Sequence, residues 1–429
     1  MNSPLRICID ARPAVGHGGG TGTFALSLAR ALLNLSDGDE QYFFLIERGD
    51  GPHLKRLLNQ SIQIVEFTLG TLTRVHRMVA RIPIARRVWR RLRILVKLLS
   101  DKAGYSRTKT DYSPLRSDGT VERRKIDVIH FTTQGGFLTD IPFIYHPHDL
   151  QHKHLPQYFT PSELSERELT YSTFCDHASM VCVASRWVKQ DLLNNLNLPE
   201  PKIRVVHFAP EPHNCLQTSP EVARTIGQKL SLPQRFIFYP ARTWPHKNHL
   251  RLIHALNVLR QDHGLTIPLV CSGEPTEFYD RISAEVKTLG LSRQVVFLGF
   301  VGFDELSALY QLCSAVIIPS LFEAGSFPMW EAFLSERPAA CSNVTSLPAQ
   351  AGDAALVFDP YEVGEIADAM YKLWTDRDLC ETLVARGRAN ISRYSWDTTA
   401  RTFRALYRQL GNRELTTEDE RLLSTQPLM

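Results

Sequence analysis

Short apolar runs, each followed by a stretch with helical spacing, recur along almost the whole chain. In the first half they are RICID (6–10), YFFLIE (42–47), IQIVEF (62–67), IDVIHF (126–131), FIYHPHDL (143–150), ASMVCVAS (178–185) and IRVVHFAP (203–210). In the second half they are RFIFYP (235–240), IPLVCSG (267–273), QVVFLG (294–299), AVIIPS (315–320), PAACS (338–342) and AALVFDP (354–360). The runs are continuously apolar rather than alternating, which indicates strands buried on both faces of a parallel sheet.

Two such alternations in 429 residues predict an α/β protein with two Rossmann-like domains, each built on a parallel sheet, facing each other across a cleft. The first domain is expected over 1–210 and the second over 235–394, with a proline-rich crossing at 211–234 between them. A C-terminal helix at 395–412 is expected to pack back toward the first domain. The polar tail, 413–429, is expected to be frayed.

The positive charge of the chain is concentrated in one segment. Residues 74–97 carry eight arginines and one lysine and no acid, and apolar residues recur there at spacings of three and four. The insertion at about 74–100 has two open interpretations. It is a helix packed on the first domain with solvated arginines, or an interfacial helix on an anionic membrane. Nucleic acid is not an expected partner, because no binding motif or interleaved aromatic pattern accompanies the charge.

Several features favour a cytoplasmic protein, with peripheral contact at the inner face of the membrane as the other possibility. The eight cysteines are scattered without a C-x-x-C pair, which indicates buried thiols in a reducing compartment. The N-terminus lacks the pattern of a signal peptide, and no apolar run is long enough to span a bilayer.

The stretch SLFEAGSFPMWEAF (320–333) contains the strongest candidate site. Glu323 is expected in the loop at the carboxyl end of a strand, where open α/β sheets bind ligands. Pro328 suits the first position of the next helix, so amide groups near Ser326 and Phe327 are expected to be free for an anion. Glu331, in the first turn, would repel a phosphate and therefore suits ribose hydroxyls. The alternative is that Glu331 only complements the helix dipole and Glu323 is an ordinary loop acid.

A second loop carries two cations. YPARTWPHKNH (239–249) follows the first strand of the second domain and places Arg242 and Lys247 five residues apart. A nucleoside diphosphate needs two cations when no metal neutralises it, and this pair could supply them.

Taken together, these motifs resemble a known family. PARTWPHKNH, SGEP, LGFV, FEAGSFPMWEAF and SNVTSLPAQAGDAALVFDP, in this order, are similar to the second domain of family 4 retaining glycosyltransferases of the GT-B type, whose signature is a Glu-x7-Glu turn. GGGTGTFALSLARAL resembles the N-terminal glycine loop of that family, and HDLQHKHLPQYF (148–159) resembles a segment of its mannosyltransferase-like and rhamnosyltransferase-like members. The resemblance covers most of the chain except 70–125 and the tail.

The resemblance implies a role for each matching residue of the second domain. Arg242 and Lys247 neutralise the donor diphosphate, Glu323 is a catalytic contact to the donor sugar, and Glu331 binds the ribose. The amides that bind sugar or phosphate are those of Ser326 and Phe327.

In the first domain, Gly19 and Gly20 let the backbone approach the donor diphosphate and the acceptor. His148 lies beside the anomeric centre with Asp149 near it, both as catalytic residues. The chain departs from the family pattern where Ala349 and Gln350 follow SLP in place of a frequent glutamate, and no role is assigned there.

The implied activity is metal-independent transfer of a hexose, with retention, from a nucleotide sugar to a glycan or lipid-linked acceptor in surface polysaccharide synthesis. GDP-mannose or a deoxyhexose nucleotide is the favoured donor, and no cofactor is expected. DRD (376–378) is not expected to bind metal, because it lies in a helical, exposed stretch. The alternatives are a nucleotide-sugar epimerase of the same paired-domain plan and a non-catalytic subunit of glycan assembly. An NAD enzyme fits less well, because GHGGGTG does not match the G-x-G-x-x-G spacing.

Overall fold

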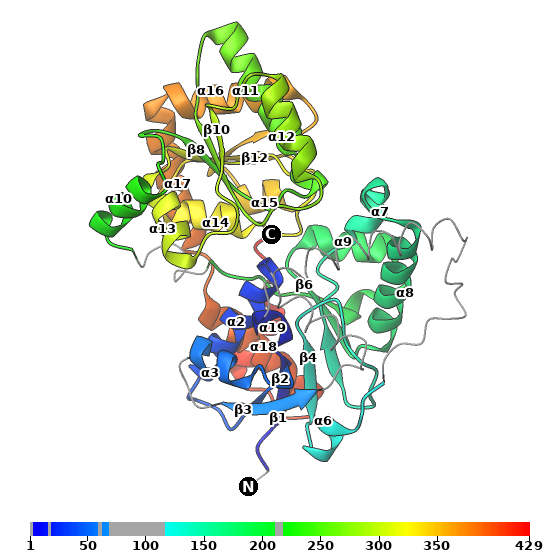
Figure 1. The fold of residues 1–429 in the computed structure, drawn as a ribbon. Helices are drawn as coiled ribbons and strands as arrows, with labels where there is room; N and C mark the ends of the chain where they lie inside the picture. Colours follow the sequence, from blue (N-terminus) through cyan, green and yellow to red (C-terminus); the bar gives the residue numbers. More distant parts are fainter. Residues whose placement is uncertain (1–2, 16–18, 59–61, 68–115, 211–217) are drawn as a thin grey trace. The chain divides into compact units, whose positions relative to one another are not determined.

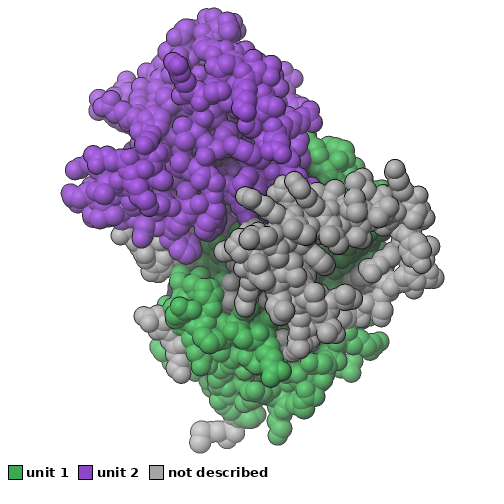
Figure 2. Space-filling model, in the orientation of Figure 1, with its two compact units in different colours: residues 1–182, 196–204, 400–424 green, residues 183–195, 205–399, 425–429 purple. Residues whose placement is uncertain are grey.

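The computed structural model describes the chain except for residues 1–2, 16–18, 59–61, 68–115 and 211–217. The described residues form two compact units, coloured separately in Figure 2. Unit 1 comprises residues 1–182, 196–204 and 400–424, and unit 2 comprises residues 183–195, 205–399 and 425–429. The insertion at 74–100 lies outside the described residues.

The first sheet has seven strands in the order β3-β2-β1-β4-β5-β6-β7, and its pairs from β3 to β6 are parallel. The strands are β1 (Arg6–Asp10), β2 (Gln41–Glu47), β3 (Gln63–Phe67), β4 (Val128–Phe131), β5 (Phe143–Tyr145), β6 (Met180–Val183) and β7 (Ile203–Val205). Figure 1 shows helices on both sides of it. The helices of unit 1 are α1 (Arg12–Val15), α2 (Gly20–Leu33), α3 (Gly51–Leu58), α6 (Thr120–Arg123), α7 (Gln151–His154), α8 (Pro161–His177), most of α18 (Trp396–Leu410), from residue 400 on, and α19 (Thr417–Ser424).

The second sheet has six strands, in the order β10-β9-β8-β11-β12-β13, and all of its pairs are parallel. They are β8 (Ile237–Pro240), β9 (Leu269–Ser272), β10 (Val295–Phe297), β11 (Ala315–Ile318), β12 (Ala339–Ser342) and β13 (Ala355–Phe358). The helices of unit 2 are α9 (Arg186–Asn195), α10 (Pro220–Lys229), α11 (His249–His263), α12 (Tyr279–Thr288), α13 (Phe303–Leu312), α14 (Phe327–Leu334), α15 (Leu347–Ala351), α16 (Val363–Thr375) and α17 (Arg377–Ile391).

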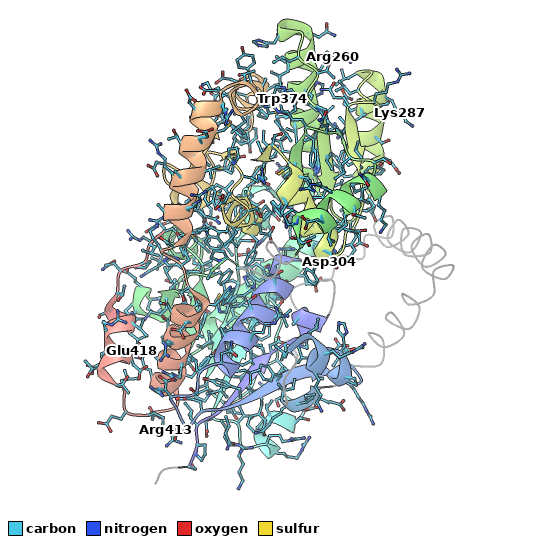
Figure 3. All side chains as sticks on the ribbon, turned by 90° about the vertical axis from the view of Figure 1, so that its left-hand side faces the viewer. Arg260, Lys287, Asp304, Trp374, Arg413 and Glu418 are labelled. Carbon is cyan, nitrogen blue, oxygen red and sulfur yellow. The ribbon has the colours of Figure 1, made fainter. Side chains whose placement is uncertain are left out.

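The predicted fold class is confirmed in each unit, since every expected apolar run contains a strand. The core of unit 2 consists of buried aliphatic side chains from the sheet and its covering helices, such as Leu256, Ile317 and Met370. Polar contacts join the helices as well. Arg260 of α11, labelled in Figure 3, donates to the carbonyls of Leu289 and Gly290, which follow α12 and lie 2.7 and 3.1 Å away.

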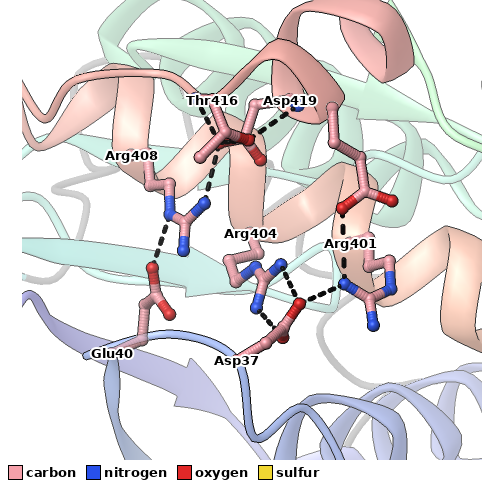
Figure 4. A network of polar contacts seen from close by, with 8 residues as sticks. Asp37, Glu40, Arg401, Arg404, Arg408, Thr416 and Asp419 are labelled. Carbon is pink, nitrogen blue, oxygen red and sulfur yellow. Dashed lines mark hydrogen bonds and ion pairs between the residues drawn. The ribbon is translucent and has the colours of Figure 1, made fainter.

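The C-terminal segment is ordered rather than frayed, so the expectation for the tail was wrong. Thr416 and Asp419 form reciprocal backbone–side-chain bonds that start α19, a capping arrangement that hydrophobic periodicity does not reveal. Arg408 of α18 donates to Asp419 (2.7 Å) and to Glu40 (2.6 Å) of the first βαβ unit. Figure 4 shows this network, in which Arg401 and Arg404 also bind Asp37.

Other expectations can be compared directly with the structure. Within the crossing expected at 211–234, residues 220–229 form α10, which packs on α13 in unit 2. The described cysteines are free thiols and all but Cys380 are buried, as predicted; Cys215 lies outside the described residues. None of the described helices is long and apolar enough to cross a membrane.

Candidate active site

The candidate residues of unit 2 lie where its strand order reverses. The central strand β8 has β9 on one side and β11 on the other, so the loops after β8 and β11 flank a topological switch point. Doubly wound sheets bind ligands at the carboxyl ends of strands at such points. Arg242 and Lys247 follow β8, and Glu323 follows β11. The topology therefore brings the two predicted loops to one edge of the sheet.

Lys247 and Glu323 form an ion pair at this edge. The Lys247 Nζ lies 2.5 Å from Glu323 Oε1, and the side chains are only 20% and 14% exposed. Ser320, which the sequence reasoning did not single out, donates its hydroxyl to the same carboxylate oxygen at 2.7 Å. The sequence prediction placed both charged residues in the site, and the structure shows that they contact each other.

Arg242 is held at another point of the same edge. Its guanidinium donates to Glu274 Oε2 at 2.8 Å, and Glu274 lies in the loop after β9. Both side chains are about one-third exposed, so the pair is accessible to solvent and weakly stabilising. A polyanionic ligand can compete with a carboxylate for a cation in such a pair.

The backbone at Ser326 corrects one prediction. The Ser326 amide was expected to be free, but it donates to Gln350 Oε1 at 2.8 Å, and Gln350 Nε2 donates back to the Ser326 carbonyl at 2.7 Å. Both residues are buried, and a buried peptide group must find hydrogen-bond partners. Gln350 provides them from 24 residues away, a pairing that spacing alone could not reveal. The role of the Phe327 amide stays a prediction.

Glu331 lies deeper in its helix than expected. Helix α14 begins at Phe327, so Pro328 is its second residue and Glu331 lies beyond the first turn. The interpretation of Glu331 as a dipole partner is correspondingly weaker, because that effect falls off within the first turn. Glu331 is 6% exposed, and its Oε2 accepts a hydrogen bond of 2.7 Å from the buried Tyr310 hydroxyl of α13. Tyr310 was missed because it lies 21 residues upstream, in an ordinary amphipathic helix.

In unit 1, two candidate positions have left-handed backbone conformations. Gly19 (φ 57°) immediately precedes α2, so Gly20 is the first residue of that helix. His148 (φ 62°) follows β5, and a positive φ in a residue other than glycine marks a conformation that the surroundings must enforce. Asp149 Oδ1 accepts from the Gln151 amide at 3.0 Å, in the turn that leads into the short helix α7.

The hydrogen bonding of His148 defines its protonation. Its Nε2 lies 2.9 Å from the carbonyl of Thr132, and because a carbonyl only accepts, Nε2 carries a proton. Burial lowers the pKa of His148. The neutral ring therefore has Nδ1 as its acceptor nitrogen.

A buried ion pair at the end of β1 was also missed. Asp10 is fully buried and accepts from the Arg12 guanidinium at 2.7 Å, in a sequence (IDAR) where an acid ends an apolar strand and a base follows two residues later. Burial would lower the pKa of Arg12, but Asp10 raises it overall. An acid at the end of a buried strand was the signal available in the sequence.

Family models match both halves of the chain. The model described as "Glycosyltransferase Family 4" matches residues 104–209, and that of "Glycosyl transferases group 1" matches residues 224–390, so together they span well over half the chain. A serotype-specific mannosyltransferase, WbdA of Escherichia coli, is 31% identical over 52% of this chain but only 28% of its own length. O-antigen chain mannosyltransferase B of Escherichia coli is 28% identical over 60% of this chain and 68% of its own.

Solved structures share the fold. HepE of Anabaena, in complex with UDP and glucose, has a TM-score of 0.67 at 16% identity and covers 94% of this chain and 100% of its own. WaaG, a glycosyltransferase involved in lipopolysaccharide biosynthesis, has a TM-score of 0.63 at 13% identity over 95% of this chain and 99% of its own. The motifs, the two doubly wound sheets and both family models agree, and the chain belongs to the family 4 glycosyltransferases with the GT-B fold.

Proposed function

We propose that the protein transfers a hexose, with retention of configuration and without a metal, from a nucleoside diphosphate sugar to a glycan or lipid-linked acceptor. The observation that carries this proposal is the ion pair of Lys247 and Glu323 at the switch point of the second sheet. A cation that is paired with a carboxylate at the carboxyl edge of the sheet suits a ligand that bears both a diphosphate and a sugar.

The proposed chemistry depends on stabilising the leaving group. As the bond from the anomeric carbon to the diphosphate oxygen breaks, negative charge grows on the diphosphate, and cations aimed at it lower the barrier. Lys247 and Arg242 would supply those charges, with the start of α14 contributing amide dipoles. The acceptor hydroxyl forms the new bond on the same face of the sugar, and its proton passes to the departing phosphate oxygen.

Other residues would orient the sugar nucleotide. Glu323 would accept from sugar hydroxyls once the donor diphosphate binds Lys247, and Glu331 would accept from the ribose. His148 would accept a hydrogen bond from a sugar hydroxyl at Nδ1, because its Nε2 donates to the Thr132 carbonyl. Gly19 would let the first unit's backbone approach the phosphates.

The relatives favour mannose and a surface polysaccharide. Two of them bear the names of O-antigen and serotype-specific mannosyltransferases. The chain spans only about a quarter of the length of WbdA, so the name of that relative does not by itself assign an acceptor or a linkage to this chain. Contact with an anionic membrane through 74–100 is proposed from the charge of that segment.

A transfer assay tests the proposal. The protein is incubated with GDP-mannose, UDP-hexoses and a mannose-terminated lipid-linked acceptor, and the new linkage is identified by NMR. We expect an α-linked product, and we expect Lys247→Met and Glu323→Gln to lower its yield by roughly a hundredfold or more. Lys229→Met is the matched control, because Lys229 also pairs with a glutamate (Glu305, 3.1 Å) but lies on α10.

Three results would contradict the proposal. An inverted linkage would overturn retention. Conversion of the nucleotide sugar to an isomer without transfer would favour the epimerase, and full pathway output from a strain carrying Glu323→Gln would favour a non-catalytic subunit.

A further inference from the structure

Three loops at the carboxyl edge of the second sheet meet at one buried side chain, that of Asn248. This residue directly follows Lys247 and is 3% exposed. Its Nδ2 donates to the carbonyl of Pro319, 2.9 Å away in the loop after β11, and to that of Pro360, 2.8 Å away in the loop after β13. One amide thus connects the loop that carries the site lysine with two loops that are distant in sequence.

Every polar group of Asn248 has a partner. Its backbone N–H donates to Pro245 (3.1 Å), its carbonyl accepts from Leu252 (3.3 Å) in the first turn of α11, and its Oδ1 accepts from Arg251 (3.1 Å). Its φ of 61° places it in the left-handed region, which asparagine tolerates better than most residues. The position therefore requires both a left-handed backbone and a side-chain donor of two hydrogen bonds.

The bonds of Asn248 are part of a set that joins the loop after β8 to the loop after β11. The Leu321 amide donates to the His246 carbonyl at 2.7 Å, which joins the same two loops on the other side of Lys247. Pro319, whose carbonyl Asn248 binds, immediately precedes Ser320, the donor to Glu323. The 2.5 Å separation of Lys247 and Glu323 thus depends on contacts between loops that start 78 residues apart in the sequence, after Pro240 and Ile318.

We propose that Asn248 is a positioning residue that sets the geometry of Lys247 relative to Glu323, and hence the strength of donor diphosphate binding. The effect on diphosphate binding rests on the proposed function, because that function assigns Lys247 to the diphosphate. The placement of Lys247 against Glu323 does not depend on the proposed function.

Two substitutions separate the requirements at this position. Asn248→Gly keeps the left-handed backbone and removes both Nδ2 bonds. Asn248→Asp keeps the size and the left-handed tendency but places an acceptor against two carbonyl oxygens. Gln294→Leu is the matched control. Gln294 is also a buried amide, and its Nε2 donates to the Ile267 carbonyl at 2.8 Å. It immediately precedes β10 and so lies at the amino end of a strand of the same sheet, away from Lys247.

The first measurement is the rate at which an amine-acylating reagent modifies Lys247, followed by peptide mass spectrometry and needing no donor. We expect both Asn248 variants to react several-fold faster than the parent protein, because the ammonium is released from Glu323, and the control to react at the parent rate. Equal rates in all four proteins would overturn the positioning role. A faster rate of Lys247 acylation in the control would also overturn the positioning role, because any loss of stability of unit 2 would then expose Lys247.

The second measurement is the affinity for GDP and UDP, together with kcat and KM for transfer. We expect the Asn248 variants to lose roughly ten- to a hundredfold in kcat/KM, with weaker diphosphate binding, because small misplacements of binding groups have effects of this size. Unchanged affinity and kcat/KM beside faster labelling would overturn the link to the donor. A parent protein that binds no nucleoside diphosphate would refute the proposed function, while the labelling result would still decide the positioning of Lys247.

Discussion

Substituting Tyr310 with phenylalanine removes one hydroxyl and tests the assignment of Glu331 to the ribose. That hydroxyl lies 2.7 Å from Glu331 Oε2, and Tyr310 is fully buried while Glu331 is 6% exposed. A hydrogen bond to a charged group contributes about 1.5–3 kcal/mol, and water has little access to replace it here. We therefore expect the free energy of unfolding of unit 2 to fall by about that amount.

The same change should alter nucleotide selectivity. The Tyr310 hydroxyl holds one oxygen of the Glu331 carboxylate, which would fix the orientation of that carboxylate toward the proposed ribose. Without that bond the carboxylate can rotate, and we expect affinity for the ribonucleoside diphosphate to fall about tenfold, the equivalent of 1.4 kcal/mol. Affinity for the 2′- and 3′-deoxy analogues should fall less, because the missing hydroxyl has no bond to lose.

Isothermal calorimetry with the three nucleotides and urea unfolding followed by fluorescence make the two measurements. Tyr145→Phe is the control, since Tyr145 is a buried tyrosine whose hydroxyl donates to the Gln134 carbonyl (2.8 Å) in unit 1. A Tyr310→Phe variant that is less stable but keeps the full preference for ribose would show that Tyr310 has only a structural role and does not orient Glu331.

Three further predictions concern metal, pH and membrane. Added chelator should leave transfer unchanged, and a loss of activity restored by Mg²⁺ or Mn²⁺ would contradict metal independence. Burial would raise the pKa of Asp419, but bonds from Arg408 and Thr416 hold it below its ordinary value. The stabilisation is therefore complete above the unfolded value of about 4 and is lost as pH falls toward the folded value, so unfolding of Asp419→Asn should depend less on pH below about 5. An unchanged pH dependence in urea unfolding would contradict this. Deleting 74–100 should abolish co-sedimentation with anionic vesicles, and unchanged sedimentation would leave that segment no membrane role.

Sequence patterns predicted the parts of the fold that depend on local order. Continuous apolar runs such as AVIIPS identified strands, because a strand that is buried on both faces of the sheet is apolar at nearly every position. Helix α19 escaped detection because a capping arrangement and the ion pair of Arg408 with Asp419 hold it in place, and neither leaves an apolar stripe.

The charged residues of the candidate site were predictable because they lie in loops that directly follow strands, where doubly wound sheets bind ligands. The sequence placed Lys247 and Glu323 each in a loop after a strand, the family resemblance assigned both to one site, and the structure brings them together. The residues that hold the site were not predictable, because Asn248, Tyr310 and Gln350 act through tertiary contacts to backbone or carboxylate groups distant in sequence. Such contacts depend on how helices pack on the sheet, which residue spacing does not encode.

The central claim is that the carboxyl edge of the second sheet recognises a diphosphate through Lys247 and Arg242. Its most direct test compares the affinities for a nucleoside diphosphate and the matching monophosphate in the parent protein and in the double variant Lys247→Met, Arg242→Met. We expect the parent protein to prefer the diphosphate by tenfold or more, about 1.4 kcal/mol, and the double variant to bind both nucleotides equally weakly. A double variant that still prefers the diphosphate would contradict that claim.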